Sequence, residues 1–162
     1  DQIARMANEG HEIATHTWDH AAGSGKGVSL NLMSTAERKE EVQKGMDAIK
    51  NAANKDASVY FRAPGGNFND SVANDLRDMV QGEIGWNIDT EDWRRPGADT
   101  IASRIKSAGP GEVILMHDVG GDRSQTVAAL REALPYLKSQ GYKFVTISEL
   151  IEAYPYQEGQ HS

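Results

Sequence analysis

The strongest constraint on the fold is an alternation of strand-like and helix-like patterns that repeats along the chain. Short apolar runs typical of strands occur at residues 11–15, 59–61, 84–88, 113–116 and 143–147. Helical patterns separate them: Ser34 and Glu37 match a capping box, and Val42, Met46 and Ile49 follow at helical spacing. This alternation predicts an α/β fold with parallel strands, either an open sheet or a (β/α) barrel.

Composition excludes several classes of protein. The 162 residues carry 24 Asp and Glu against 17 Lys and Arg, a net charge of −7, without a basic stripe. Nucleic acid and anionic lipid are therefore not expected as partners. The absence of cysteine rules out disulfides and thiolate metal sites but leaves the cellular compartment open. No internal linker interrupts the chain, so residues 1–162 are expected to form one domain. The charged run at residues 37–41 is expected to be a solvated helix face.

Ionisable residues cluster where the predicted strands end. The clusters are His16 with His20, Arg62, Asp89 with Asp92, and His117 with Asp118. In α/β folds the carboxyl ends of the strands carry the active site. Packing alone does not account for four successive strands that end in such residues. The arrangement therefore predicts an enzyme.

Each cluster also has an alternative interpretation, in which its residues have no catalytic or metal-binding role. His16 and His20 are four residues apart, a spacing that suits one divalent ion, typically zinc. Alternatively, one of the two histidines is hydrogen-bonded within the protein and the other is solvated. Arg62 precedes a turn in which the Gly65 N–H suits an oxyanion, or the turn is an ordinary Pro-Gly turn. His117 suits a general acid beside a carboxylate, or is a core histidine. The segment 89–93 suits a carboxylate that orients a histidine beside an indole wall, or is a charged loop over a packed Trp.

Taken in order, these segments resemble the NodB-homology polysaccharide deacetylases, carbohydrate esterase family 4, and look most like its bacterial peptidoglycan N-acetylglucosamine deacetylases. The second family motif, H-[ST]-x-x-[HD], is matched by residues 16–20, and the R-x-P turn by residues 62–64. The fourth motif, D-x-x-D-W, is matched by residues 89–93, and the apolar strand ending in His by residues 113–117. The resemblance implies a distorted (β/α) barrel of the NodB type that hydrolyses an acetamide on a glycan and releases acetate.

The resemblance also implies a role for each matched residue. His16 and His20 would ligate a divalent metal, with zinc the expected ion. His117 would be the general acid, Asp92 would hold its imidazole, and Arg62 would fix the catalytic base. The residues implied to stabilise the oxyanion or surround the acetyl methyl are Gly65, Trp93, Ile114 and Leu115.

The chain departs from the family pattern in two places. Nothing matches the first motif, T-F-D-D-G, which supplies the base and the third metal ligand in the family. The first β/α unit is therefore expected to be lacking here, and an N-terminal piece is expected to supply it, either docked as another chain or as part of a longer protein. Gly65 also stands where an aromatic residue commonly follows the proline.

The sequence is compatible with three functions. The first is a metal-dependent deacetylase acting on peptidoglycan, with chitin oligosaccharides and then acetylated xylan as further substrates. The second is a non-catalytic carbohydrate-binding relic of the same fold, and the third is an unrelated α/β enzyme. Because peptidoglycan and chitin lie outside the membrane, the protein is expected to be exported, as an extracellular or cell-surface protein.

Overall fold

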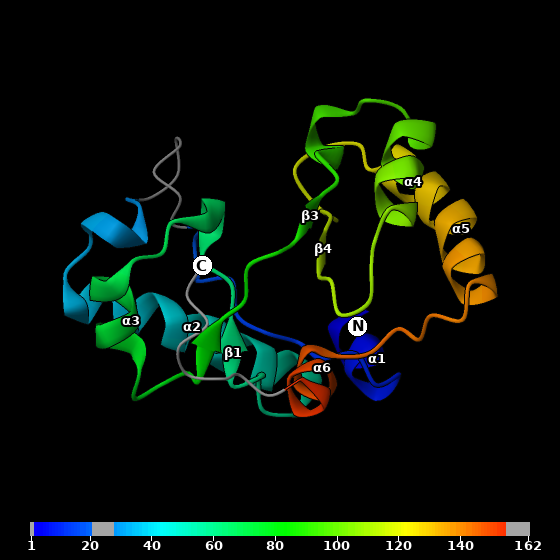
Figure 1. The fold of residues 1–162 in the computed structure, drawn as a ribbon. Coiled ribbons are helices and arrows are strands. Elements are labelled where there is room, and N and C mark those ends of the chain that lie inside the picture. The colour runs from blue at the N-terminus through cyan, green and yellow to red at the C-terminus, as the bar shows by residue number, and fades with distance from the viewer. Residues whose placement is uncertain (1, 21–27, 155–162) are drawn as a thin grey trace. The chain divides into compact units, whose positions relative to one another are not determined.

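The computed structural model describes residues 2–20 and 28–154 (Figure 1). The chain divides into two compact units, Asp1–Gly85 and Trp86–Ser162, and each is described here by itself. No helix among the described residues is both long enough and apolar enough to cross a membrane.

In the first unit, helices alternate with short strands as the sequence predicts. The elements are α1 (Gln2–Asn8), the 3-10 helix η1 (Leu30–Leu32), α2 (Thr35–Ala53), β1 (Tyr60–Phe61), η2 (Pro64–Gly66), α3 (Asp70–Leu76) and β2 (Gly82–Glu83). The predicted capping box is confirmed, because the Glu37 N–H donates to Ser34 Oγ and the Ser34 N–H donates to the Glu37 carboxylate. Helix α2 ends at Ala53 and is capped by Asn54, which adopts a left-handed conformation with φ 53°.

The strands of the first unit are parallel but shorter than expected. β1 pairs with β2, with Tyr60 opposite Gly82 and Phe61 opposite Glu83. The predicted strand at 11–15 contributes a single bridge, Thr15 to Phe61. The predicted strand at 84–88 is wrong as one element: β2 ends at Glu83 and the next strand begins only at Ile88, on either side of the junction between the two units.

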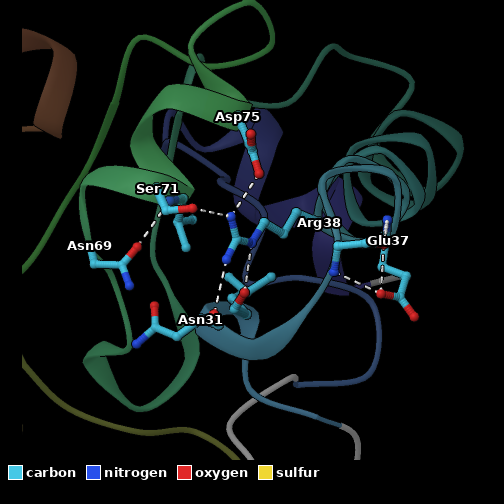
Figure 2. Close-up of polar contacts among 9 residues, drawn as sticks. Asn31, Glu37, Arg38, Asn69, Ser71 and Asp75 are labelled. Atoms are coloured by element: carbon cyan, nitrogen blue, oxygen red, sulfur yellow. Dashed lines mark hydrogen bonds and ion pairs between the residues drawn. The ribbon is translucent and has the colours of Figure 1, made fainter.

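The first unit's core also contains an arginine. Its apolar cluster consists of Leu30, Val42, Phe61, Ala63, Val72, Leu76 and Val80. Beside it, Arg38 is 5% exposed and donates to the carbonyls of Leu30 and Asn31, to Ser71 Oγ and to the Asp75 carboxylate at 2.7 Å (Figure 2). The prediction that residues 37–41 form a solvated face is therefore wrong at Arg38. The guanidinium is tolerated in the core because its N–H groups find acceptors there.

The second unit contains two parallel strands and three α-helices among its described residues. They are β3 (Ile88–Asp89), η3 (Asp92–Arg94), α4 (Ala98–Lys106), β4 (Ile114–Leu115), α5 (Ser124–Ser139) and α6 (Ile147–Ala153). In the β3–β4 pair, Ile88 lies opposite Ile114 and Asp89 opposite Leu115. The core packs α4 on α5 through Ile101, Ala102, Ile105, Ala129, Ala133 and Leu137.

The predicted strand at 143–147 is wrong. These residues form no strand, Phe144 and Val145 are about half exposed, and Ile147 already begins α6. A capping box between Thr146 and Glu149 explains the start of that helix, because each residue's side chain bonds the other's backbone N–H. The segment borders a groove of about 910 Å³ whose apolar lining includes Ile114, Leu130 and Leu134.

Candidate active site

The first unit brings together the two histidines predicted as metal ligands. Thr15 bridges to β1, and the chain beyond it carries His16 and His20. Their imidazole rings are edge to face, with centroids 5.0 Å apart, and both residues are exposed. Thr17 and His20 have left-handed backbone conformations, with φ of 67° and 60°, which tighten the segment so that the rings meet.

The hydrogen bond of His16 determines which of its ring nitrogens suits a metal. His16 Nδ1 lies 2.7 Å from the carbonyl oxygen of Arg62. Because a carbonyl only accepts, Nδ1 carries the proton and Nε2 holds the lone pair. Metal-binding histidines commonly have this arrangement, so the donor chemistry fits a divalent ion such as zinc. Across residues 2–20 and 28–154, no group of three or more His, Asp or Glu is placed to hold a metal.

Helix α2 lies against the histidine segment. The backbone N–H groups of Trp18 and Asp19 both donate to Glu41 Oε2, at 3.1 and 3.2 Å. One turn along the same face of the helix is Gly45. A Cβ added at Gly45 would lie 2.0 Å from the Oγ1 of Thr15, so only glycine allows this close approach of the helix to the chain.

Arg62 connects this segment to the end of the first unit. Its backbone N–H donates to the carbonyl of Thr15 at 3.2 Å. Its guanidinium donates to the carbonyls of Ile84 and Gly85, at 2.8 and 3.0 Å. Burial lowers the pKa of Arg62 from its usual value, and the charge of Glu83 opposes that shift. The expected role of Arg62, to orient a catalytic base, stays a prediction.

The turn after Arg62 has the backbone conformation that the double glycine suggests. Gly65 and Gly66 have φ of 65° and 68°, in the left-handed region where residues with a Cβ are strained. The Gly66 N–H donates to the carbonyl of Ala63. Gly65 is exposed, and its N–H makes no hydrogen bond to another residue of the described chain. Its use as an oxyanion donor stays a prediction.

The second unit brings together Asp92 and His117. Asp92 begins η3 and is 1% exposed. His117 Nδ1 lies 2.7 Å from Asp92 Oδ1, and the His117 backbone N–H donates to Asp92 Oδ2 at 2.8 Å. Thr126, at the start of α5, donates its hydroxyl to the same Oδ2 at 2.9 Å. The imidazole therefore bonds one oxygen of a carboxylate whose other oxygen is held by the His117 amide and the Thr126 hydroxyl.

The pKa of Asp92 follows from two opposed effects. Burial favours the neutral acid and raises the pKa, but the hydrogen bonds from the His117 ring, the His117 amide and Thr126 together outweigh it, so the pKa lies below its usual value. The carboxylate is thus ionised near neutral pH and can only accept. His117 Nδ1 therefore carries a proton, and Nε2 is the nitrogen left for exchange with a substrate. The His117 side chain is 37% exposed.

The three remaining predicted residues lie in the second unit. Trp93 is half exposed, with the guanidinium of Arg94 4.8 Å from its ring centroid. Leu115 is buried, and its carbonyl accepts from Thr90 Oγ1 at 2.7 Å. Ile114 packs against the core between α4 and α5. That they surround an acetyl methyl stays a prediction.

Two residues that hold the site were missed by the sequence analysis. Glu41 lies in a charged run whose sequence looks solvated, and Thr126 lies in the first turn of a helix where a hydroxyl is unremarkable. No local pattern marks either residue, because each acts on a segment far away in the chain: Glu41 on Trp18 and Asp19, and Thr126 on Asp92.

The chain has an α/β fold, because parallel strand pairs alternate with helices, and its candidate histidines and carboxylate follow the ends of the strands. The model of the polysaccharide deacetylase family matches residues 1–80. A peptidoglycan-N-acetylglucosamine deacetylase of Bacillus cereus is 36% identical over 92% of this chain and 67% of its own length. A chitooligosaccharide deacetylase of Bradyrhizobium sp. is 32% identical over 91% of this chain and 70% of its own length.

Solved structures place the fold in the same family. A CE4 family pseudoenzyme from Bacillus anthracis has a TM-score of 0.78 and 31% identity, over 92% of this chain and 49% of that chain. The chain thus spans about half of that protein and about two thirds of the B. cereus relative. The chain belongs to the polysaccharide deacetylase family and has its NodB-type α/β fold, which confirms the resemblance seen in the sequence motifs.

Proposed function

We propose that this chain is part of a metal-dependent deacetylase that removes N-acetyl groups from a glycan, foremost the N-acetylglucosamine of peptidoglycan. The observation that carries the proposal is the buried Asp92 carboxylate bonded to Nδ1 of His117 at 2.7 Å. That pair, like His16 and His20, falls on a family motif. The peptidoglycan deacetylase of B. cereus, 36% identical, supports the substrate.

In this mechanism the chain's own residues bind, orient and move a proton. A divalent ion held by His16 and His20, foremost zinc, would polarise the acetamide carbonyl and activate water. The Gly65 N–H donates to the carbonyl oxygen as negative charge develops on it. His117, protonated at both ring nitrogens, gives the Nε2 proton to the sugar nitrogen as the C–N bond breaks, which leaves acetate and a free amine. Asp92 keeps the imidazole oriented throughout.

The proposal requires groups beyond the described residues. We propose that a segment N-terminal to this sequence supplies the catalytic base and a third metal ligand, that Arg62 orients that base, and that the two compact units act as one catalytic domain. The two-ligand set His16 and His20 supports the need for a third ligand. The apolar groove beside β4, about 910 Å³, supports the docking of a further strand. We also propose that the protein is exported to the cell wall.

Acetate release from purified peptidoglycan and from chitooligosaccharides by the full-length protein tests the function. We expect release from peptidoglycan, with the loss of at least about 1,000-fold in kcat for His117→Ala, as for other general acids and their orienting groups. His11→Ala, at an exposed histidine outside the motifs, is the matched control and keeps full activity. Equal rates for His117→Ala and wild type would contradict the mechanism.

A non-catalytic carbohydrate-binding protein is the second candidate. The observation that favours it is the structural likeness to a CE4 family pseudoenzyme at 31% identity. In that case the full-length protein binds glycan but releases no acetate, and His117→Ala leaves binding unchanged. The same assay therefore separates the two functions.

A further inference from the structure

Glu41 of α2 contacts the backbone of the segment between the two candidate metal ligands. A single carboxylate oxygen of Glu41 accepts from the N–H groups of Trp18 and Asp19, at 3.1 and 3.2 Å. Two consecutive backbone N–H groups that converge on one anion form a concave binding site of known type. Hydrogen bonds to a charged acceptor are also stronger than those between neutral groups.

The segment that Glu41 contacts adopts a backbone that needs support. Thr17 and His20 both have positive φ, 67° and 60°, which is costly for residues with a Cβ and persists only where the surroundings enforce it. Trp18 and Asp19 lie between them and make both contacts with Glu41. His16 is held independently, through Nδ1 and the carbonyl of Arg62. The turn that presents His20 to His16 is therefore tied to α2.

The neighbouring turn of α2 shows that this contact is part of a longer interface. Gly45 is four residues beyond Glu41 and so lies on the same helix face. A Cβ at Gly45 would meet Thr15 Oγ1 at 2.0 Å and the carbonyl of Thr17 at 3.3 Å. The helix thus runs against residues 15–19, with Gly45 allowing close approach and Glu41 supplying the anchor.

We propose that Glu41 is a positioning residue that holds the Thr17–His20 turn so that His20 and His16 can share one divalent ion. This inference rests on the proposed function, because the ion is part of that function. Glu41 acts through the backbone of the turn, where it accepts from the Trp18 and Asp19 N–H groups. It is therefore needed for the arrangement of the two imidazoles before any ion arrives.

Two measurements on the full-length protein, which includes the segment proposed to supply the third ligand, test this role. Zinc titration by calorimetry reports the ligand pair, and amide hydrogen exchange without metal reports the turn. We expect Glu41→Ala to weaken zinc binding about ten-fold, the scale seen when groups that orient metal ligands are removed. We also expect Trp18 and Asp19 to exchange at least about ten-fold faster in metal-free Glu41→Ala. Glu41→Gln keeps an acceptor oxygen without the charge and should fall in between.

Glu40→Ala is the matched control, because Glu40 is the preceding residue of the same helix and, within the described part of the chain, forms an ion pair with the half-exposed Lys44 at 2.6 Å. It removes the same charge and should leave zinc affinity and both exchange rates unchanged.

Zinc binding and amide exchange that are unchanged in Glu41→Ala would overturn the positioning role of Glu41. If wild type takes up no zinc while the two amides still depend on Glu41, the metal site of the proposed function fails and the positioning role stands. If Glu41→Ala does not fold, Glu41→Gln decides by the same two readouts.

Discussion

In the first unit His16 is oriented by a backbone carbonyl, whereas in the second unit His117 is oriented by a buried carboxylate. A neutral carbonyl fixes the tautomer and leaves a neutral imidazole with its lone pair on Nε2, which suits a cation. The Asp92 carboxylate accepts from Nδ1 and leaves Nε2 of His117 for proton exchange with a substrate. The two units thus contain the same side chain in two settings, and the partner of Nδ1 differs between the proposed metal ligand, His16, and the proposed general acid, His117.

The contacts that hold these histidines in place also differ between the two units. The histidine segment of the first unit depends on a helix that approaches closely, through Glu41 and Gly45, and on the core beneath that helix. His117 depends on a compact set of hydrogen bonds around Asp92. Disturbing the core should therefore harm the first site most, and disturbing one carboxylate should harm the second.

The largest effect on stability is expected for Arg38→Ala. The substitution leaves the buried Leu30 carbonyl, the partly buried Asn31 carbonyl and the Ser71 hydroxyl without their donor, so the free energy of unfolding of the first unit should fall by about 3 kcal/mol. Urea unfolding followed by amide exchange in each unit measures it. Lys39→Ala, which removes an exposed pair with Asp78, is the control and should change little. An equal loss in both variants would contradict the structural role of Arg38.

A somewhat smaller effect is expected for Gly45→Ala. The added methyl group collides with Thr15 Oγ1, which should cost about 2 kcal/mol and displace Thr15, the residue before His16. Zinc affinity should fall together with stability. Thr15→Ala removes the colliding oxygen, so the double variant should recover part of the loss, whereas purely additive losses would contradict the contact.

The smallest effect on stability is expected for Asp92→Asn, and it depends on pH. The pKa of Asp92 is lowered in the folded chain, so its ionised form adds stability above the unfolded pKa, about 3.9, and that contribution is lost as the pH falls through the lower folded value. Stability of the wild type should therefore fall more steeply below about pH 4 than that of Asp92→Asn. Thermal unfolding across pH 2–6 measures it, with Asp118→Asn, an exposed neighbour of His117, as control. Parallel profiles for the wild type and Asp92→Asn would count against the lowered pKa.

Local patterns in the sequence predicted much of this molecule. The capping box at Ser34, the strand at Tyr60–Phe61 and the strand at Ile114–Leu115 depend on neighbouring residues, and the structure contains them. The family motifs placed His16 with His20, and Asp92 with His117. Strands at 84–88 and 143–147 were expected because their apolar residues suit a strand, but pairing depends on partners elsewhere in the chain. The sequence analysis also missed the structural roles of Glu41, Thr126 and Arg38. Each of these side chains bonds residues that are distant in the sequence.

The most direct test is the tautomer of both histidines in the metal-free chain, read from long-range ¹H–¹⁵N correlations of the imidazole rings at alkaline pH. The account predicts that His16 and His117 both carry the proton on Nδ1, with the His117 Nδ1 proton exchanging faster once Asp92→Asn removes the carboxylate. A proton on Nε2 of His16 would contradict the assignment of that histidine as a metal ligand through Nε2. A proton on Nε2 of neutral His117 would contradict its orientation by Asp92.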